Sequence, residues 1–401
     1  MYYSYHHSYF PDDILVFIEE INREENTVIF DFIDSNEYSK FDAALQIRNS
    51  IERASMVKVI NYRQRSIREN TTYAIDRNVL MRMSENVEQI ENSFLFGYSI
   101  NLSNSTEILF KASVTIGERD RFDIGAIVGG GRQAEILDIP LGGRIDINVR
   151  NVGQGNWNEV IANQTVKVVY DAGCYMNASK AVVRTYIGTK VTEYSNNKPC
   201  LILSHWDKDH YHALVGMTDA ELQCFSSFIC PNIRPNITSR ILYGRIENAI
   251  GTHNIYAVAN IAKMKGVPPT LGLISPRGNS LMIFNSTMNR DRNQAGIVIV
   301  VNTHRSSIIM PGDCHYKLLS DVLLPILNRT HDHNLVVPHH GGNAGAYLYA
   351  MMPGTIPQHA VISVGRNRWG HPKPVYTSGL TMNGFQVTDT QTFAGDIIIN
   401  L

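Results

Sequence analysis

The sequence predicts an α/β protein, with a sandwich over residues 140–401 and an additional β-rich domain over residues 1–135. Three observations lead to this prediction. After residue 140, apolar runs typical of strands recur with potential helices between them. Several of these runs end in histidine or aspartate, as expected where strand ends line a site at one edge of a sheet. Before residue 135, no cluster of potential catalytic residues accompanies the apolar runs.

The first 135 residues contain short apolar runs separated by charged stretches. Strands joined by turns are predicted in NTVIFDFI, ASMVKVINY, FLFGYSINL and STEILFKASVTI, with one helix across residues 78–92. The run VGGGR at 128–132 lacks the Gly-Lys-Ser/Thr ending of a phosphate loop. We interpret it as a linker near the domain boundary. A protein partner, if the chain has one, is expected to bind through this first domain.

Residues 140–401 contain a regular series of predicted strands. The first two are RIDINVRNVG and NEVIANQTVKVVYDAG, a crossover helix is predicted in ASKAVVRTYIGTKV, and PCLILSHWDKDH predicts the next strand. Later strands are predicted in SLMIFNS, AGIVIVVNTHRSSIIMPGD, NLVVPHHGG, AVISVG, FQVTDT and GDIIINL. The segment VNTHRSS, which contains His304, predicts a hairpin turn.

The composition excludes several classes of protein. Of the 401 residues, 44% are hydrophobic and 18% are charged, which is typical of a globular chain. The net charge of −1 predicts no overall basic surface for nucleic acid. No apolar run approaches the roughly 20 residues that cross a bilayer, so no membrane association is expected. The N-terminus lacks a secretory pattern and the five cysteines are scattered, which predicts a cytoplasmic protein without a disulfide framework.

The segment SHWDKDH at 204–210 follows a buried strand and concentrates potential metal ligands. His205, Asp207, Asp209 and His210 can wrap one tight loop and point nitrogen and oxygen donors at adjacent cations. Such donors suit Zn²⁺ or Mn²⁺, whereas the absence of cysteine disfavours a thiolate site. The alternative for so short a charged segment is a solvated polar turn.

Other strand ends strengthen the metal interpretation. Asp313 ends IIMPGD, His339 and His340 follow LVVP, and His371 lies in VGRNRWGHP. One such junction is more often a helix or turn cap. Several in one order indicate a common site, in which an aspartate between two metals can bridge them.

These motifs resemble a known family. The order NVGQGN (151–156), DAG (171–173), SHWDKDH, GD (312–313), PHHGG (338–342) and SVGRNRWGHP (363–372) is similar to the metallo-β-lactamase fold, and closest to the hydrolase domain of ComEC-type competence proteins. The ending FQVTDTQTFAGDIIINL resembles the last hairpin of that domain. The resemblance covers residues 145–401 and implies an αββα sandwich with metals at the sheet edge.

The resemblance also implies a site for one or two divalent ions, Zn²⁺ or Mn²⁺. Its ligands would be His205 and Asp207 for the first ion, Asp209 and His210 for the second, Asp313 as a bridge, and His339 or His340 to complete the second site. Asp171 would orient the ligand loop by accepting hydrogen bonds. Gln154 and Asn156 would approach the site or support the fold.

The chain departs from the commonest pattern of the family in its first metal site. That pattern has histidine where this chain has Asp207, and the harder carboxylate favours Mn²⁺. The family also has a further histidine before the bridging aspartate, for which the candidates here are His212, His253 and His304. None of the three lies in a convincing motif.

A metal-dependent hydrolase is the function that these residues favour, because clustered carboxylates without metal would repel each other. Arg366, Arg368 and Lys373 would neutralise a phosphate while His371 donates a proton to the leaving oxygen, although a solvated loop is the alternative. We therefore predict a phosphodiesterase or nuclease that uses metal-activated water, with Asp209 and His371 as catalytic residues. The alternative is a catalytically idle scaffold in a multi-protein assembly; an acyl or lactam hydrolase is less favoured.

Overall fold

A computed structural model describes residues 13–45, 55–63, 66–102, 109–113, 139–276, 280–289, 292–327, 331–349, 351, 354–367 and 369–401. The chain divides into two compact units, Met1–Ile127 with Ile233–Tyr243 and Val128–Asn232 with Gly244–Leu401. The predicted linker at 128–132 lies outside the described residues. The separability of residues 1–135 therefore stays a prediction. The sequence offered no sign that a segment after residue 232 joins the first unit.

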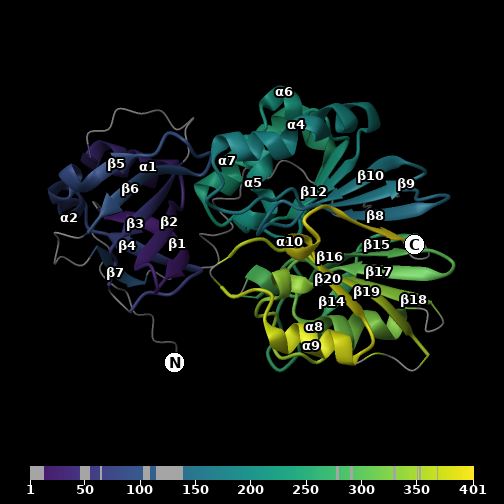
Figure 1. The fold of residues 1–401 in the computed structure, drawn as a ribbon. Helices are drawn as coiled ribbons and strands as arrows, with labels where there is room; N and C mark the ends of the chain where they lie inside the picture. Colours follow the sequence, from purple (N-terminus) through teal and green to yellow (C-terminus); the bar gives the residue numbers. More distant parts are fainter. Residues whose placement is uncertain are drawn as a thin grey trace. The chain divides into compact units, whose positions relative to one another are not determined.

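In the first unit, seven described strands form one sheet in the order β5-β6-β3-β2-β1-β4-β7 (Figure 1). Its elements are β1 (Ile14–Asn22), β2 (Thr27–Phe32), α1 (Ser35–Leu45), β3 (Met56–Ile60), β4 (Thr71–Ile75), α2 (Arg77–Arg82), η1 (Ser84–Asn86), β5 (Val87–Gln89), β6 (Phe96–Asn101) and β7 (Phe110–Ser113). Phe41 of α1 packs on Phe30 and Phe32 of β2. The β-rich character predicted for this region is thus present.

The helix predicted across residues 78–92 is much shorter than expected. Asp76 caps α2 by accepting a hydrogen bond from the Asn78 amide, and α2 ends at Arg82. The following Val87–Gln89 pairs with β6 as an edge strand. Cross-strand pairing therefore outweighs the local helical preference of this segment.

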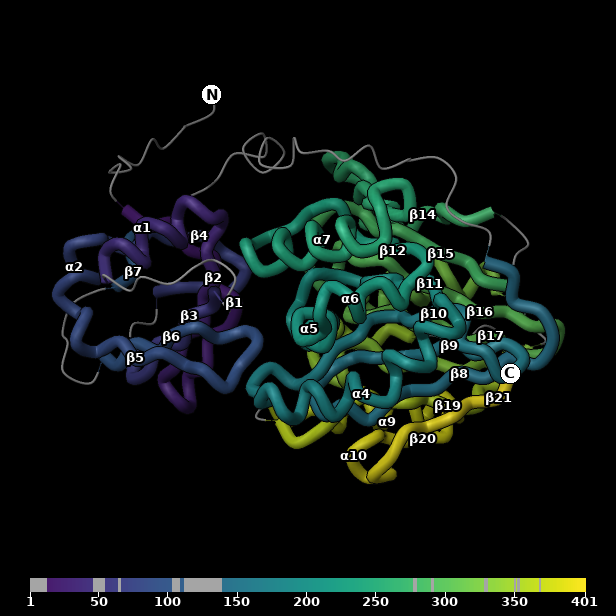
Figure 2. The backbone as a smooth tube through the Cα atoms, turned by 90° about the horizontal axis from the view of Figure 1, so that it is seen from above, coloured from purple at the N-terminus to yellow at the C-terminus, as the bar shows by residue number. Residues whose placement is uncertain are grey.

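The second unit consists of two sheets, each with seven described strands (Figure 1). Their orders are β13-β12-β11-β10-β9-β8-β21 and β14-β15-β16-β17-β18-β19-β20. Figure 1 shows α4, α5 and α6 on the outer face of the first sheet, and α8 and α9 on the outer face of the second. Figure 2 looks down on the first sheet, with β12 to β8 and β21 side by side. The unit is therefore the αββα sandwich that the family resemblance implied.

The second unit contains more elements than the sequence predicted. They are β8 (Ile145–Val149), β9 (Asn158–Ala162), β10 (Thr165–Tyr170), α4 (Lys180–Asn197), β11 (Cys200–Ile202), α5 (Lys208–Gly216), α6 (Asp219–Leu222), β12 (Ser227–Pro231), η2 (Thr252–Asn254), β13 (Ile255–Val258), β14 (Leu271–Leu273), β15 (Leu281–Ser286), η3 (Arg292–Gln294), β16 (Ile297–Asn302), β17 (Ser306–Met310), α8 (Tyr316–Leu318), the π-helical η4 (Leu319–Leu323), η5 (Leu324–Ile326), β18 (Asp332–Val336), η6 (Pro338–Gly341), β19 (Ile356–Ile362), α9 (Pro374–Met382), β20 (Gln386–Asp389), α10 (Thr390–Phe393) and β21 (Ile397–Asn400). Helix α7 (Ile237–Ile250) begins in the first unit and ends in the second.

The central strands carry apolar side chains on both faces, which is why they read as continuous hydrophobic runs. In β16, Ile299 and Val301 point into the core between the sheets, whereas Val298 and Val300 pack under the helices. A sheet covered on both faces needs this composition. The alternation sends every strand through the middle of the sandwich, so that polar residues are left at the strand ends.

Two sequence predictions about strands were wrong. NEVIANQTVKVVYDAG forms two strands, because Asn163 and Gln164 both adopt left-handed backbone conformations, with φ of 50° and 63°, and turn the chain between β9 and β10. The expected last hairpin does not form either. Strand β20 pairs with β19 in the second sheet, whereas β21 pairs with β8 in the first.

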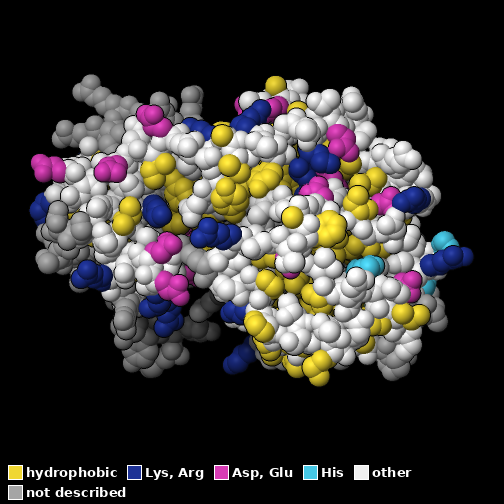
Figure 3. All heavy atoms as spheres, viewed as in Figure 1, with side chains coloured by type: hydrophobic (Ala, Val, Ile, Leu, Met, Phe, Trp, Pro, Cys, Tyr) yellow, Lys and Arg dark blue, Asp and Glu magenta, His cyan; other side chains and the backbone are white. Residues whose placement is uncertain are grey.

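The described chain contains no helix that is both long and apolar enough to cross a membrane. On the face drawn in Figure 3, basic and acidic side chains are interspersed, in line with the net charge of −1. Any recognition of a charged substrate must therefore come from local groups.

His333 in β18 makes a prediction about stability. Burial lowers its pKa to about 4, and its ring contacts the Tyr349 hydroxyl at 2.6 Å. Between about pH 6.5 and pH 4 the unfolded chain binds a proton that the folded chain does not, so the free energy of unfolding falls with decreasing pH, by up to about 3 kcal/mol. His333→Gln should flatten this decline in denaturant titrations at pH 7 and pH 4.5. His304→Gln, in an exposed turn, is the control for removing a histidine; parallel pH profiles of wild type and His333→Gln would contradict the assignment.

Candidate metal centre

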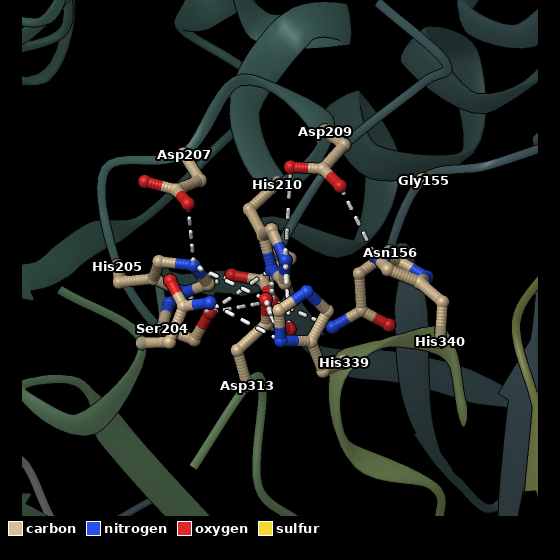
Figure 4. A network of polar contacts seen from close by, with 12 residues as sticks. Gly155, Asn156, Ser204, His205, Asp207, Asp209, His210, Asp313, His339 and His340 are labelled. Carbon is tan, nitrogen blue, oxygen red and sulfur yellow. Dashed lines mark hydrogen bonds and ion pairs between the residues drawn. The ribbon is translucent and has the colours of Figure 1, made fainter. Parts of the chain in front are cut away.

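The site lies where strands of both sheets end. Strands β10 and β11 are parallel, as are β17 and β18, so each pair ends at one edge of its sheet. Asp171 follows β10, the loop 204–210 follows β11, Asp313 follows β17, and the two histidines follow β18. Figure 4 shows these side chains pointing toward one another. The centre therefore requires both sheets.

Two overlapping groups of side chains could hold a metal ion among the described residues. One group consists of His205, His210 and Asp313, and the other of Asp209, His210 and His340; within each, the donor atoms lie within 4.8 Å of one another. His340 Nε2 lies 3.2 Å from Asp209 Oδ2, and His210 Nε2 lies 3.2 Å from Asp313 Oδ1. The structure thus brings five of the seven predicted ligands together.

Asp171 organises these groups from below. Its buried carboxylate accepts hydrogen bonds from the Ser204 amide at 2.6 Å, the Ser204 hydroxyl at 2.8 Å and Asn156 Nδ2 at 2.7 Å. It also contacts His210 Nδ1 at 2.8 Å. With a φ of 59°, Asp171 turns the chain sharply at the end of β10. One carboxylate therefore holds the ligand loop, the glycine-rich loop and a histidine ring.

The histidines have a donor arrangement that fits a metal ion. Their Nδ1 atoms have partners, which are Ser204 Oγ for His205, Asp171 for His210 and the Ser363 carbonyl for His340. Their Nε2 atoms are buried and make no hydrogen bond within the described chain, and neither does Oδ1 of Asp313. A histidine with an anchored Nδ1 and a free Nε2 is the usual form of a metal ligand. A divalent ion would satisfy these atoms.

Asp207 lies outside both groups, in contrast to the expectation that it binds the first ion. Its Oδ1 lies 3.1 Å from Nη2 of Arg292, and its Oδ2 lies 3.5 Å from Nε2 of His205. Arg292 Nη1 also donates to the Trp206 carbonyl at 3.2 Å. Burial would raise the pKa of Asp207, but Arg292 and then His205 hold it below its usual range. Protein charge therefore neutralises this carboxylate, which the sequence did not reveal.

The pair His339–His340 is resolved by the backbone. Both residues are left-handed, with φ of 52°, a conformation that non-glycine residues rarely adopt. This conformation turns His340 into a donor group, whereas His339 Nδ1 contacts Asn293 Nδ2 at 3.1 Å and lies 3.6 Å from Asp313 Oδ2. Among the described residues, His340 but not His339 joins a group.

Electrostatics keep the carboxylates of the centre ionised. Burial would raise the pKa of Asp313, but His339, His210 and His205 hold it well below its usual range. Burial would likewise lower the pKa of His210, yet Asp313 and Asp171 raise it well above its ordinary value. A metal ion that binds His210 must therefore displace a proton.

Close backbone contacts require two glycines near the centre. A Cβ on Gly173 would lie 1.6 Å from the Asp209 carbonyl oxygen, and one on Gly312, whose φ is 57°, would lie 2.7 Å from Ser204 Cβ. The Asp209 carbonyl also accepts a hydrogen bond from the Asn156 amide at 2.8 Å. The DAG, GD and NVGQGN motifs thus pack directly on the ligand loop.

A rigid loop holds His371 beside the centre. Asn367 braces it, because its side chain accepts from the His371 amide at 2.9 Å and donates to the His371 carbonyl at 2.8 Å. His371 Nδ1 lies 3.3 Å from Gln154 Nε2, and its ring centroid lies 5.6 Å from that of His339. Burial, followed by the charges of His339, His340 and Lys373, lowers the pKa of His371 to about 3. A neutral ring at pH 7 opposes the expected role as general acid.

The remaining candidates lie away from the donor groups. His212 is buried in α5 against the Tyr175 carbonyl at 3.2 Å, and burial lowers its pKa to about 4. His253 and His304 are exposed, so none of the three supplies a further first-site ligand in the described structure. Arg366 is exposed and Lys373 is half-buried. Arg368 lies outside the described residues.

Sequence reasoning missed three residues that shape the site: Ser204, Arg292 and Asn367. Ser204 could have been suspected, since it precedes the ligand loop and follows a strand. The other two carry no local signal. Their importance arises from contacts with distant segments.

No protein-family model matches this chain, and no curated protein sequence matches it. Among solved structures, it is similar to human tRNase Z, short form, with 12% identity, a TM-score of 0.28, and coverage of 48% of this chain and 78% of that chain. It is also similar to a variant of the β-hydroxylase CmlA, with 10% identity, a TM-score of 0.37, and coverage of 92% and 78%. CmlA itself, a diiron β-hydroxylase from Streptomyces venezuelae, has 9% identity, a TM-score of 0.37, and coverage of 94% and 69%. Likenesses this weak decide neither the activity nor the metal of this chain.

The network around Asp171 predicts a defect in metal retention. Asp171→Asn replaces one accepting oxygen with a donor that faces other donors, so the ligand loop should loosen while all proposed ligands remain. We expect affinity for a divalent ion to fall by about 10- to 100-fold, measured by competition with a chelator. Asp146→Asn, which affects a surface pair with Arg144, is the control. Unchanged affinity in a folded Asp171→Asn protein would contradict this role.

Proposed function

We propose that the second unit is a metal-dependent hydrolase of phosphodiesters, a phosphodiesterase or nuclease. The observation that carries the proposal is the convergence of unsatisfied donors, namely Nε2 of His205, His210 and His340 with Oδ1 of Asp313, in a buried centre at the sheet edge. Such a set has no structural use without a cation, because its polar atoms would remain buried and unpaired. The resemblance to ComEC-type hydrolase domains supports the same activity.

A divalent ion held by His210, His340, Asp209 and Asp313 would supply a Lewis acid that makes water a better nucleophile at neutral pH. Two imidazoles and two carboxylates suit Zn²⁺ and Mn²⁺. The ionised Asp209, about one quarter exposed, is the group able to accept a proton from the attacking water. Asp313 is almost fully buried and serves as a ligand.

The loop around His371 supports a nucleotide or nucleic-acid substrate. Arg366 and Lys373 bring positive charge to the mouth of the centre, where a phosphate would lie. Trp369 is 41% exposed, and its ring centroid lies 6.1 Å from that of His371. An exposed indole beside cationic groups is a platform on which a base can stack. Neutral His371 would then position the phosphate by a hydrogen bond.

The intact donor set speaks against the alternative of an idle scaffold. A scaffold has no reason to keep four histidine and aspartate side chains buried with their donor atoms unpaired. An acyl hydrolase is less favoured, since it has no use for the cationic loop. A protein partner for residues 1–135 stays a prediction.

Removal of the central carboxylates tests the function. Asp313→Ala and Asp209→Ala should each abolish metal retention and hydrolysis together, measured by elemental analysis and by a panel of DNA, RNA, cyclic nucleotides and nitrophenyl diesters with Mn²⁺ or Zn²⁺. Asp219→Ala, an exposed aspartate on α6, is the control. Metal-replete wild-type protein that cleaves no member of the panel would count against a phosphodiesterase. Full activity of Asp313→Ala would remove the metal mechanism.

The role of His371 can be separated by leaving groups. A nitrophenyl diester needs little protonation at the departing oxygen, whereas a nucleotide diester needs much. Because His371 is neutral, His371→Ala should slow both substrates by a similar factor, about 10- to 100-fold, without loss of metal. His253→Ala is the control. A much larger loss on the nucleotide diester would restore His371 as the proton donor.

A further inference from the structure

We propose that the guanidinium of Arg292 takes the place of a second metal ion, so that the centre holds one divalent cation per chain. The inference rests on the proposed metal centre and specifies its composition. It concerns a residue that neither the sequence motifs nor the family resemblance singled out.

Arg292 is built into the centre on the side of Asp207. Its side chain is 16% exposed, its Nη2 lies 3.1 Å from Asp207 Oδ1, and its Nη1 donates to the Trp206 carbonyl at 3.2 Å. The guanidinium is therefore fixed between two adjacent residues of the ligand loop. A fixed, permanently charged group at this position competes with a cation for the same carboxylate.

The histidine geometry also limits the number of ions. Both donor groups depend on Nε2 of His210, because its Nδ1 is taken by Asp171. One imidazole nitrogen has one lone pair and binds one ion. If an ion binds with Asp209 and His340, the other position keeps only His205, Asp313 and an Asp207 already paired with Arg292. That remainder is a poor site for a second ion.

The charges balance with a single ion. Asp207, Asp209 and Asp313 together carry three negative charges when ionised. One divalent cation and the Arg292 guanidinium supply three positive charges. A second divalent ion would leave excess positive charge beside a buried guanidinium, which is costly in a region of low dielectric constant.

The competing interpretation is that Arg292 only orients Asp207 as a ligand in a two-ion centre. The two interpretations predict different stoichiometries. Chelator-treated full-length protein would be reloaded with excess Mn²⁺, desalted, and analysed for metal content and by electron paramagnetic resonance. We expect one Mn²⁺ per chain with the spectrum of an isolated ion. Two ions per chain with a spin-coupled spectrum would overturn the proposal, and so would the absence of any bound ion.

Variants of Arg292 test its part directly. Arg292→Ala frees Asp207 and should raise the content to about two ions per chain with a coupled spectrum, whereas Arg292→Lys keeps a charge and should stay at one. Arg305→Ala, an exposed arginine in the β16–β17 turn, is the matched control and should also stay at one. A folded Arg292→Ala protein that still binds one ion would refute the exclusion of the second ion by Arg292.

A second variant covers the case in which Arg292→Ala does not fold. Asp207→Asn should leave the content at one ion per chain, because Asp207 is not a ligand of that ion. A fall in content would mean that Asp207 ligates, against the proposal. These measurements need no substrate. One ion per chain without phosphodiester cleavage would thus reject the proposed function and leave the role of Arg292 intact.

Discussion

The site depends first on one buried carboxylate. Asp171 accepts hydrogen bonds from the ligand loop and from Asn156, and it anchors the ring of His210. A buried carboxylate is costly unless its oxygens are fully satisfied, so this position stabilises the centre only as a complete network. Loss of one partner would leave the others poorly paired. The left-handed turn at Asp171 belongs to the same network, because it sends the chain under the ligand loop.

The sandwich explains why such a network can be assembled at all. Asp171 and the loop 204–210 come from the first sheet, whereas Asp313 and His340 come from the second. Neither sheet holds a complete donor group without the other. Packing of the apolar faces between the sheets therefore positions the donors, and a cation would in turn stabilise the packed state.

Charge distribution separates the two sides of the centre. On one side, Asp209, Asp313, His210 and His340 face one another with unsatisfied atoms at Nε2 of both rings and at Asp313 Oδ1. On the other, Asp207 is neutralised by Arg292. An arginine in the position of a cation supplies positive charge without exchange, since it cannot be deprotonated or removed by a chelator. The rigid loop bearing His371 and the exposed Trp369 adds a further surface beside the donors.

The sequence by itself determined the αββα class, most strands of the second unit and the set of residues from which the centre is drawn, because hydrophobic periodicity and strand-end motifs are local properties. Only the tertiary structure decided that His340 joins a donor group, that β20 and β21 belong to different sheets, and that Asp207 is paired. The first depends on left-handed backbone at two consecutive histidines, and the second on competition between strand partners. The third depends on Arg292, which lies 86 positions from the Trp206 carbonyl that helps to hold it. Contacts between such distant segments are set by how the whole chain packs, and no local pattern encodes them.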